Sequence, residues 1–185
     1  MFVAMLISPL LFAEVHTYQI SPQRSTLTFD VSAQIHHVHG TSNAFSGTVT
    51  GDPADITTTR IEVKLDPKAF DTDNEKRDKV MREKSLEVDK YPFVKFTSSS
   101  ITAPEKQLVP GKPTSITVNG RLELHGVEQD VSIPVTLTWN ESDLSANGDL
   151  ALHLDDWKIF RPKVVFFRLE NDIKIHFQIG ATRLQ

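Results

Sequence analysis

The stretch Val131-Ser132-Ile133-Pro134-Val135-Thr136-Leu137-Thr138-Trp139 has an apolar residue at every odd position and Ser, Pro or Thr at every even one. Successive side chains of a β-strand point to opposite faces, so this stretch predicts a strand with one apolar and one polar face. Eight short stretches of the chain alternate in this way. Because a sheet made of such strands buries its apolar face most simply by closing on itself, we expect an all-β fold, a single antiparallel barrel of about eight strands.

Length and composition limit the possible functions. The chain has 185 residues, which suits one domain with a sizeable core. Its formal net charge is −4 at pH 7, whereas a nucleic-acid partner normally requires a basic face, so we expect no nucleic-acid partner. The chain contains no cysteine, which excludes disulfides, thiol catalysis and cysteine-ligated metal centres.

The first residues indicate export. Residues 1–13 read MFVAMLISPLLFA and carry no charge. An apolar run of about a dozen residues is too short to span a bilayer and has the length of the apolar region of a signal peptide. We therefore expect cleavage after Ala13, a mature domain of residues 14–185 with no transmembrane segment, and a periplasmic or otherwise exported protein. The alternative is that this run forms an apolar first strand.

Alternation and turn signals divide the mature chain into elements. We expect turns at Ser21-Pro22-Gln23, Gly51-Asp52-Pro53, Gly126–Gln129 and Asn147-Gly148, and an irregular register in the serine run of residues 98–100. The expected strands are Val15–Ile20, Ser25–Gln34, a strand centred on Phe45–Val49, Thr59–Leu65, Phe93–Ile101, Ser115–His125, Val131–Trp139 and Asn171–Ile179, with a further inward row at Leu150, Leu152 and Leu154.

The alternation of apolar and polar residues with a period of two stops between Thr72 and Val88. This segment contains no Gly or Pro and is dense in charged residues, and Thr72-Asp73-Asn74-Glu75 has the form of a capping box. We expect one short helix that ends before Leu86. It lies near one end of the barrel, either as a solvated surface helix or as a lid.

The inward apolar residues form the first candidate site. If the barrel stays open they line a tunnel, and if it does not they form a self-filled core; the period alone does not separate the two. A lipid tail in such a tunnel gains about 0.8 kcal/mol for each CH₂ removed from water. The predicted lining residues are Leu27, Phe29, Val31, Ile61, Val63, Leu65, Leu122, Leu124, Ile133, Val135, Leu137, Leu150, Leu152, Ile173, Ile175 and Phe177.

Two long runs resemble a known family. One is Asn74…Arg77-Asp78…Met81…Leu86…Tyr91-Pro92…Phe96-Thr97-Ser98, and the other is Val118-Asn119-Gly120-Arg121-Leu122-Glu123-Leu124-His125-Gly126-Val127…Val131…Ile133-Pro134-Val135. Both are similar to the YceI-like family, and the likeness covers nearly the whole mature chain. One region departs from it: many members carry an Arg-x-Asp-Phe-Gly segment where this chain reads Trp157–Phe167, so the contacts of that loop are not carried over.

The resemblance implies a fold and a ligand. The family has an extended, lipocalin-like antiparallel barrel with a helix near one end. Its long apolar tunnel binds polyisoprenoid or similar amphiphilic lipids, and many members are periplasmic. Dimers occur in the family, which makes a homodimer one expected partner arrangement besides the lipid itself.

A histidine cluster at His36-His37-Val38-His39 is the sharpest local feature. His37 and His39 share one face of an extended segment, a spacing that suits zinc or copper. A third ligand would have to come from His125, Asp30 or a helix carboxylate, and no further motif supports one. We therefore expect no metal and no other cofactor, and interpret the cluster as a polar strand end and turn closed by Gly40.

Other polar residues are candidates for the ends of the tunnel. An arginine fork suits a phosphate or carboxylate head, so we consider Arg77 and Arg82 on the helix and Arg161 and Arg168 near the late loop; simple solvation is the alternative. Trp139 and Trp157 are expected to pack at barrel ends. Surface or edge positions are expected for the remaining histidines, which are His16, His125, His153 and His176.

These observations predict an exported binding protein that holds a polyisoprenoid or fatty-acid-like amphiphile in a barrel tunnel for transport, storage or sequestration. The chain lacks Gly-x-Ser-x-Gly, P-loop and His-Glu-x-x-His motifs, so we expect no enzyme. One alternative is a cavity enzyme, isomerase-like or cyclase-like, that acts on a lipid. The other is a filled-core interaction or metal-binding module.

Overall fold

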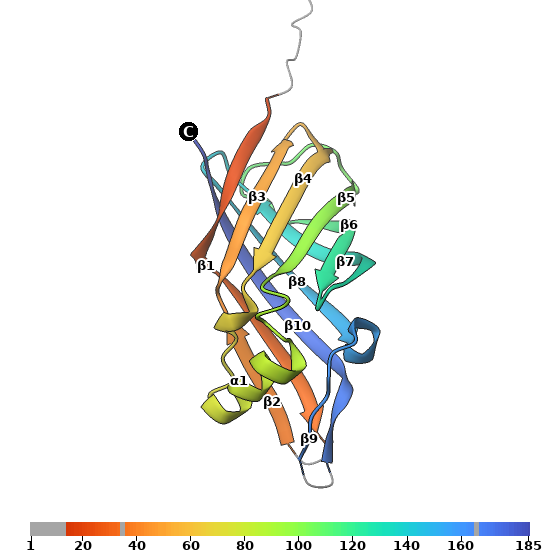
Figure 1. Cartoon of the computed structure of the whole chain (residues 1–185). Helices are drawn as coiled ribbons and strands as arrows, with labels where there is room; N and C mark the ends of the chain where they lie inside the picture. The colour runs from red at the N-terminus through yellow and green to blue at the C-terminus, as the bar shows by residue number, and fades with distance from the viewer. Residues whose placement is uncertain (1–13, 34–35, 165–166) are drawn as a thin grey trace, which may run out of the picture.

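The computed structural model describes residues 14–33, 36–164 and 167–185, so the predicted signal peptide at residues 1–13 lies outside the described residues. One antiparallel sheet dominates the described residues, and β10 pairs with β1 to close it into a barrel (Figure 1). This confirms the all-β barrel of about eight strands. Around the barrel lie β1 (His16–Ala33), β3 (Phe45–Asp52), β4 (Asp55–Leu65), β5 (Val94–Thr102), β6 (Thr114–Leu124), β7 (Val127–Trp139), β8 (Asp143–His153) and β10 (Phe167–Arg183).

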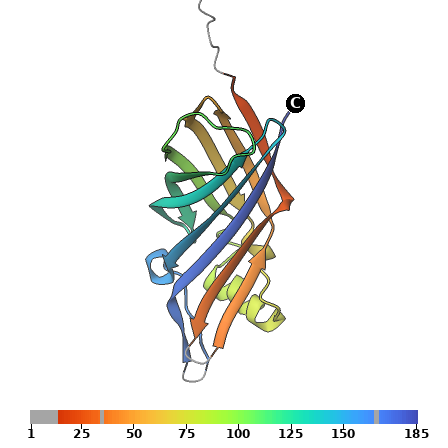
Figure 2. The ribbon, with the colours of Figure 1, turned by 180° about the vertical axis from the view of Figure 1, so that it is seen from behind.

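The pairing of β1 with β10 runs along nearly the full length of both strands (Figure 2). The predicted turn at Ser21-Pro22-Gln23 is wrong, because β1 continues through it with an irregular register between Ser21 and Thr26. The Ser25 hydroxyl bridges the irregularity, since it donates to the Ser21 carbonyl at 2.7 Å and accepts from the Gly180 N–H at 3.2 Å. Pro22 is tolerated in this strand because an interrupted ladder does not need its missing N–H.

Two further strands extend the sheet. Strand β2 (His36–Ser42) pairs with the second half of β1, and the short β9 (Lys163–Val164) pairs with the start of β10. The predicted turn closed by Gly40 is therefore wrong. Gly40 lies inside β2, where a Cβ would come within 2.2 Å of the Phe29 ring. The absent side chain lets Phe29 pack across β2.

Two hairpin turns differ from the expected ones. Asn147-Gly148 lies inside β8, paired with β7 on one side and β10 on the other, so that predicted turn is wrong. Gly148 serves packing instead, because a Cβ there would come within 2.7 Å of the Phe177 ring. The β6–β7 turn consists of His125 and Gly126, with φ of 52° and 72°, which is the left-handed geometry of a two-residue hairpin.

The helix α1 (Glu75–Val80) continues as a wide turn η2 (Met81–Ser85), so the helical segment ends before Leu86, as predicted. Its cap is Asn74, whose side chain accepts from the Arg77 N–H at 3.0 Å. The predicted capping box that begins at Thr72 is wrong, because the Thr72 hydroxyl donates to the buried Asp78 carboxylate instead. Figure 1 shows α1 and η2 at the end of the barrel that β2 extends.

The opposite end of the barrel is covered by the loop between β5 and β6. This loop hydrogen-bonds to the β3–β4 connection and to the start of β4. The Leu108 N–H donates to the Pro53 carbonyl and the Ile56 N–H donates to the Lys106 carbonyl, both at 2.8 Å. Ile56 is only 1% exposed beneath it. The two tryptophans belong to different core clusters. Trp139 packs in the cluster that contains Tyr18, at this end of the barrel, and Trp157 packs in the cluster that contains Phe29, towards the other end, as expected.

The buried side chain of His125 holds the segment that follows η2 against the β6–β7 turn. The His125 Nδ1 lies 3.1 Å from the Trp157 carbonyl, its Nε2 lies 2.9 Å from the Glu87 carboxylate, and the Tyr91 ring packs edge-on against it. Its side chain is 7% exposed, so the expected surface or edge position is wrong. Because these contacts join three separate segments, we call His125, Glu87 and the Trp157 carbonyl the latch. His153 and His176 are exposed, as expected.

Replacement of the latch histidine tests this role. His125→Ala should lower the free energy of unfolding by about 1–3 kcal/mol, because the Trp157 carbonyl and the Glu87 carboxylate both lose their imidazole partner. Amide exchange at residues 87–91 should accelerate. His176→Ala is the matched control, since the His176 side chain is exposed and pairs with the Asp149 carboxylate at 2.9 Å. It should change stability by less than about 0.5 kcal/mol in the same urea titration. Equal effects of the two variants would contradict the latch.

Candidate functional site

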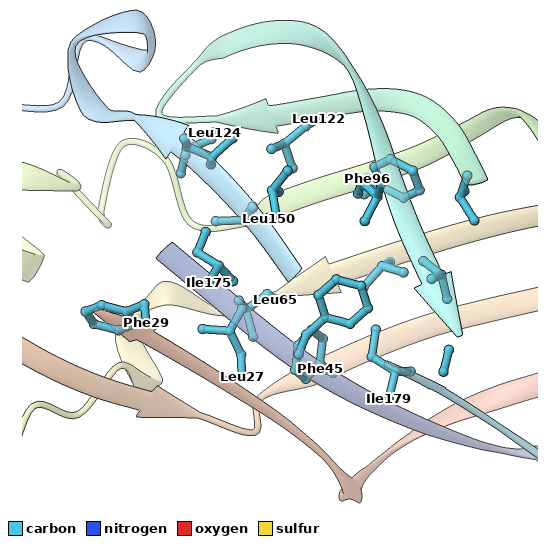
Figure 3. A pocket seen from close by; sticks show the side chains of 18 of the residues that line it. Leu27, Phe29, Phe45, Leu65, Phe96, Leu122, Leu124, Leu150, Ile175 and Ile179 are labelled. Atoms are coloured by element: carbon cyan, nitrogen blue, oxygen red, sulfur yellow. The ribbon is translucent and has the colours of Figure 1, made fainter. Parts of the chain in front are cut away.

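The barrel encloses one continuous cavity of about 900 Å³, near the upper end of the usual range for ligand pockets. Side chains from strands all around the barrel point into it, and those drawn in Figure 3 are apolar. Among the described lining residues the only charged side chains are Asp52 and Arg77. The cavity is therefore an apolar bore with polar groups near its ends.

The sixteen predicted lining residues all border this cavity. Their contact with a ligand stays a prediction. They come from six strands, and each belongs to the inward row of its strand: Leu27, Phe29 and Val31 in β1; Ile61, Val63 and Leu65 in β4; Leu122 and Leu124 in β6; Ile133, Val135 and Leu137 in β7; Leu150 and Leu152 in β8; Ile173, Ile175 and Phe177 in β10.

Further lining residues were missed by the sequence prediction. Some lie in regularly alternating rows, and a strict period of two would have found them: Phe45, Val49, Phe96, Ile116, Val118 and Ile179. Ile101 also lines the cavity, but it follows the register shift between Ser98 and Ser100, so a strict period would have missed it. Others come from segments without a strand period, where no local signal marks them as inward: Phe70, Met81, Ile159, Phe160 and Pro162.

A polar cluster stabilises the covered end of the bore. The Trp139 indole N–H donates to the Tyr18 hydroxyl, which in turn donates to the Asn140 carbonyl at 3.3 Å. Burial raises the pKa of the Tyr18 hydroxyl, so it remains a donor at neutral pH. The His16 Nδ1 lies 3.2 Å from the same hydroxyl, and His16 is 4% exposed, so its expected surface or edge position is wrong. These bonds occupy the hydroxyl, which is consistent with a structural role.

The N-terminal edge of this cluster reaches solvent. The Nε2 of His16 lies 2.9 Å from the Glu14 carboxylate, and Arg183 lies 3.3 Å from the same oxygen. Hydrogen bonds from His16 and Arg183 hold the pKa of the Glu14 carboxyl below its usual value. Glu14 therefore stays ionised at neutral pH and pairs the first described residue with the end of β10.

The other end of the bore is a mouth beside α1. Its rim includes Val38 of β2, Asn74 and Arg77 of the helix segment, and the partly exposed Val80 and Phe160. Val80 is 40% exposed and Phe160 is 57% exposed. Because these apolar side chains face both the cavity and solvent, the rim offers a path along which an apolar chain can enter.

Arg77 is held in place at this mouth. Its Nε donates to the Thr72 hydroxyl at 2.7 Å, and its Nη2 donates to the Thr72 carbonyl. Thr72 is positioned by the Asp78 carboxylate, which is 5% exposed and also accepts from the Thr72 N–H at 3.2 Å. The buried carboxylate thus fixes the threonine, and the threonine fixes the guanidinium. Arg77 Nη1 has no partner among the residues that the structure describes.

The other three predicted head-group arginines do not line the cavity or cannot be placed. Arg82 contacts the Phe70 carbonyl at 3.4 Å outside the lining. Arg161 pairs with Asp155 and donates to the Leu169 carbonyl at 2.8 Å, and its side chain is 12% exposed. The side chain of Arg168 lies outside the described residues.

The two candidate metal ligands lie on the outer face of β2. His37 Nδ1 lies 3.1 Å from the Ser32 hydroxyl, and His39 Nδ1 lies 3.0 Å from the Asp30 carboxylate. In the described part of the chain, no group of three or more His, Asp or Glu residues is placed to hold a metal ion. His125, which we considered as a third ligand, belongs to the latch instead. Metal binding at His37 and His39 stays untested.

Within residues 14–33, 36–164 and 167–185, no helix has both the length and the apolar character that a membrane crossing requires.

Comparison with known proteins places the chain in a family. The model of the YceI-like domain matches residues 18–181. A UPF0312 protein of Pseudomonas savastanoi is 32% identical over 143 residues, which cover 74% of this chain and 71% of the relative. A UPF0312 protein of Yersinia enterocolitica is 31% identical over 124 residues, covering 62% of this chain and 60% of the relative.

Solved structures share the fold at low identity. BcnA of Burkholderia cenocepacia superimposes with a TM-score of 0.74 at 20% identity and covers 88% of this chain and 99% of its own. A protein of Saccharophagus degradans described as a polyisoprenoid binding domain gives 0.74 at 16% identity, over 90% and 98%. The domain match spans the barrel that closes between β1 and β10. The chain therefore belongs to the YceI-like family.

Proposed function

We propose that this protein binds an amphiphilic lipid, polyisoprenoid or fatty-acid-like, with the lipid tail inside the barrel cavity. The observation that carries the proposal is the continuous bore of about 900 Å³, whose lining is apolar along its middle. The Saccharophagus degradans protein, which has the same fold and is described as a polyisoprenoid binding domain, supports a polyisoprenoid ligand. The tail enters at the mouth beside α1, because the other end is covered by the β5–β6 loop.

The energetics favour a tail over a polar guest. Burial of a dozen CH₂ groups contributes about 10 kcal/mol before the costs of ordering the chain. A polar guest would lose its hydrogen bonds to water without replacement, because the middle of the bore offers few donors or acceptors. Selection among lipids then depends on the length and width of the tail.

A binding role accounts for the cavity better than catalysis does. The ionisable side chains among the described lining residues are Tyr18, Asp52 and Arg77, and they lie near the ends of the bore. Tyr18 is occupied by Trp139 and Asn140, and Asp52 accepts from the Ala54 N–H at 2.8 Å. A lipid isomerase or cyclase would need an acid or base beside the reacting carbons. Such a group is not present along the described middle of the bore.

The biological role we propose is transport, storage or sequestration of the lipid outside the cytoplasm. It rests on the predicted signal peptide at residues 1–13. No metal or other cofactor is required for this role, because burial of the tail supplies the affinity.

A blocked bore tests lipid binding. Leu150→Trp places an indole in the middle of the cavity, where Leu150 and Ile175 point inward (Figure 3). If the indole keeps two CH₂ groups of the lipid tail out of the cavity, the affinity for a long prenyl or acyl probe should fall about tenfold or more. The matched control is Ala151→Trp, which adds the same ring on the exposed outer face of β8. The readout is probe displacement, with thermal unfolding to show that both variants fold.

The two variants separate the possible results. Weaker binding by Leu150→Trp alone supports occupation of the bore. Unchanged binding by Leu150→Trp, in a folded protein, would place the lipid elsewhere and contradict the proposal.

Export is tested by expression of the full chain in a bacterial host. We expect a mature species that begins near Glu14 in the periplasmic fraction, identified by intact mass and N-terminal sequencing. An unprocessed chain that starts at Met1 and stays in the cytoplasm would show that the exported role is wrong.

A further inference from the structure

A second, smaller pocket of about 360 Å³ adjoins the mouth of the bore. It lies between the outer face of β2 and the segment that leads into α1, and it is polar. Thr72 and Arg77 line both this pocket and the main cavity, so the two spaces share a wall. The other lining residues are His37, His39, Thr41, Asp71 and Asp73. We call this space the rim pocket.

The backbone holds the two sides of the rim pocket together. Thr41 of β2 and Asp71 exchange both backbone hydrogen bonds, at 2.8 and 3.0 Å, so the helix segment begins as a short continuation of the sheet. Side chains alternate along β2: Val38 lines the bore, whereas His37 and His39 line the rim pocket. A molecule that leaves the bore beside Val38 and Arg77 therefore reaches the rim pocket around the edge of β2.

Hydrogen bonding determines what His39 can offer. Its Nδ1 lies 3.0 Å from the Asp30 carboxylate, which only accepts when ionised, so Nδ1 carries the proton. In the neutral imidazole, Nε2 is then an acceptor, and it has no protein partner among the described residues. Arg77 supplies further N–H donors to the same pocket, since the described residues engage its Nε and Nη2, both through Thr72, and leave Nη1 without a partner. A hydroxyl group matches both, because it donates through its hydrogen and accepts through its oxygen.

The charges of the rim pocket disfavour an anion. Its ionised lining residues at pH 7 are Asp71, Asp73 and Arg77, which sum to −1 with His37 and His39 neutral. A phosphate or carboxylate head would be repelled by two carboxylates and attracted by only one guanidinium among these lining residues. A neutral head avoids that repulsion and keeps the bonds to Arg77 and His39.

We propose that the rim pocket is the head-group subsite of this protein and that it receives a neutral, hydroxyl-bearing head, such as that of a long-chain prenol. The proposal rests on the proposed function, because the tail occupies the bore. The head hydroxyl donates to His39 Nε2 and accepts from Arg77, and it stays partly hydrated at the open rim.

Three probes with one common tail test the subsite: farnesol, farnesyl phosphate and the hydrocarbon farnesene. His39→Ala should weaken farnesol binding roughly 3- to 10-fold, through loss of one hydrogen bond, and leave farnesene binding unchanged. His39→Gln should restore part of the loss, because the amide oxygen also accepts. The matched control is His176→Ala, which removes an exposed histidine that likewise pairs with an aspartate and lies outside both pockets; it should affect neither probe.

A second variant tests the charge argument. The double substitution Asp71→Asn and Asp73→Asn keeps the oxygen of residue 71 that accepts from the N–H of residue 73 while it removes both charges. The ratio of farnesyl phosphate affinity to farnesol affinity should rise roughly 3- to 10-fold.

Each contrary result has a distinct meaning. Equal loss of farnesol and farnesene in His39→Ala would show that His39 shapes the mouth, and no loss of either would place the head elsewhere; both overturn the subsite and leave the bore intact. Tighter binding of farnesyl phosphate than of farnesol by the unmodified protein would overturn the neutral head. If farnesene and farnesol both fail to bind the unmodified protein, the proposed function fails first.

Discussion

The antiparallel pairing of β1 with β10 is the constraint on which the rest of the structure depends. It runs from Tyr18 opposite Arg183 to Ala33 opposite Leu169, and it joins the first barrel strand to the last. Without it, the sheet would have two open edges and its apolar face would meet water. With it, the apolar side chains of every strand point into the barrel and the polar side chains that alternate with them point to solvent.

The closed barrel can hold a ligand because one of its ends is covered and the other is open. At one end the β5–β6 loop covers Ile56, and Tyr18 and Trp139 hydrogen-bond beside it. At the other end α1 lies beside an opening, and the latch of His125 and Glu87 holds the following segment against the barrel. The inward apolar side chains, aliphatic and aromatic, leave a bore of about 900 Å³ between these ends.

The sequence predicts the barrel well because a period of two is a local property, visible in Val131–Trp139 alone. The same locality explains the errors. Asn147-Gly148 is a strong local turn signal, but ladders to β7 and β10 on both sides hold it extended. The burial of His125 and the chain from Asp78 through Thr72 to Arg77 depend on segments that meet only in the fold. Whether the bore is filled depends on the barrel's diameter, which the alternation does not specify.

Native mass spectrometry of the protein purified from its own host tests the central claim, an open bore that holds a lipid tail, most directly. We expect a fraction of the protein to carry a mass increment that organic solvent removes and that fragments as a single amphiphile with a long apolar chain. Protein that is uniformly ligand-free, and that takes up neither prenyl nor acyl chains when they are supplied, would contradict it.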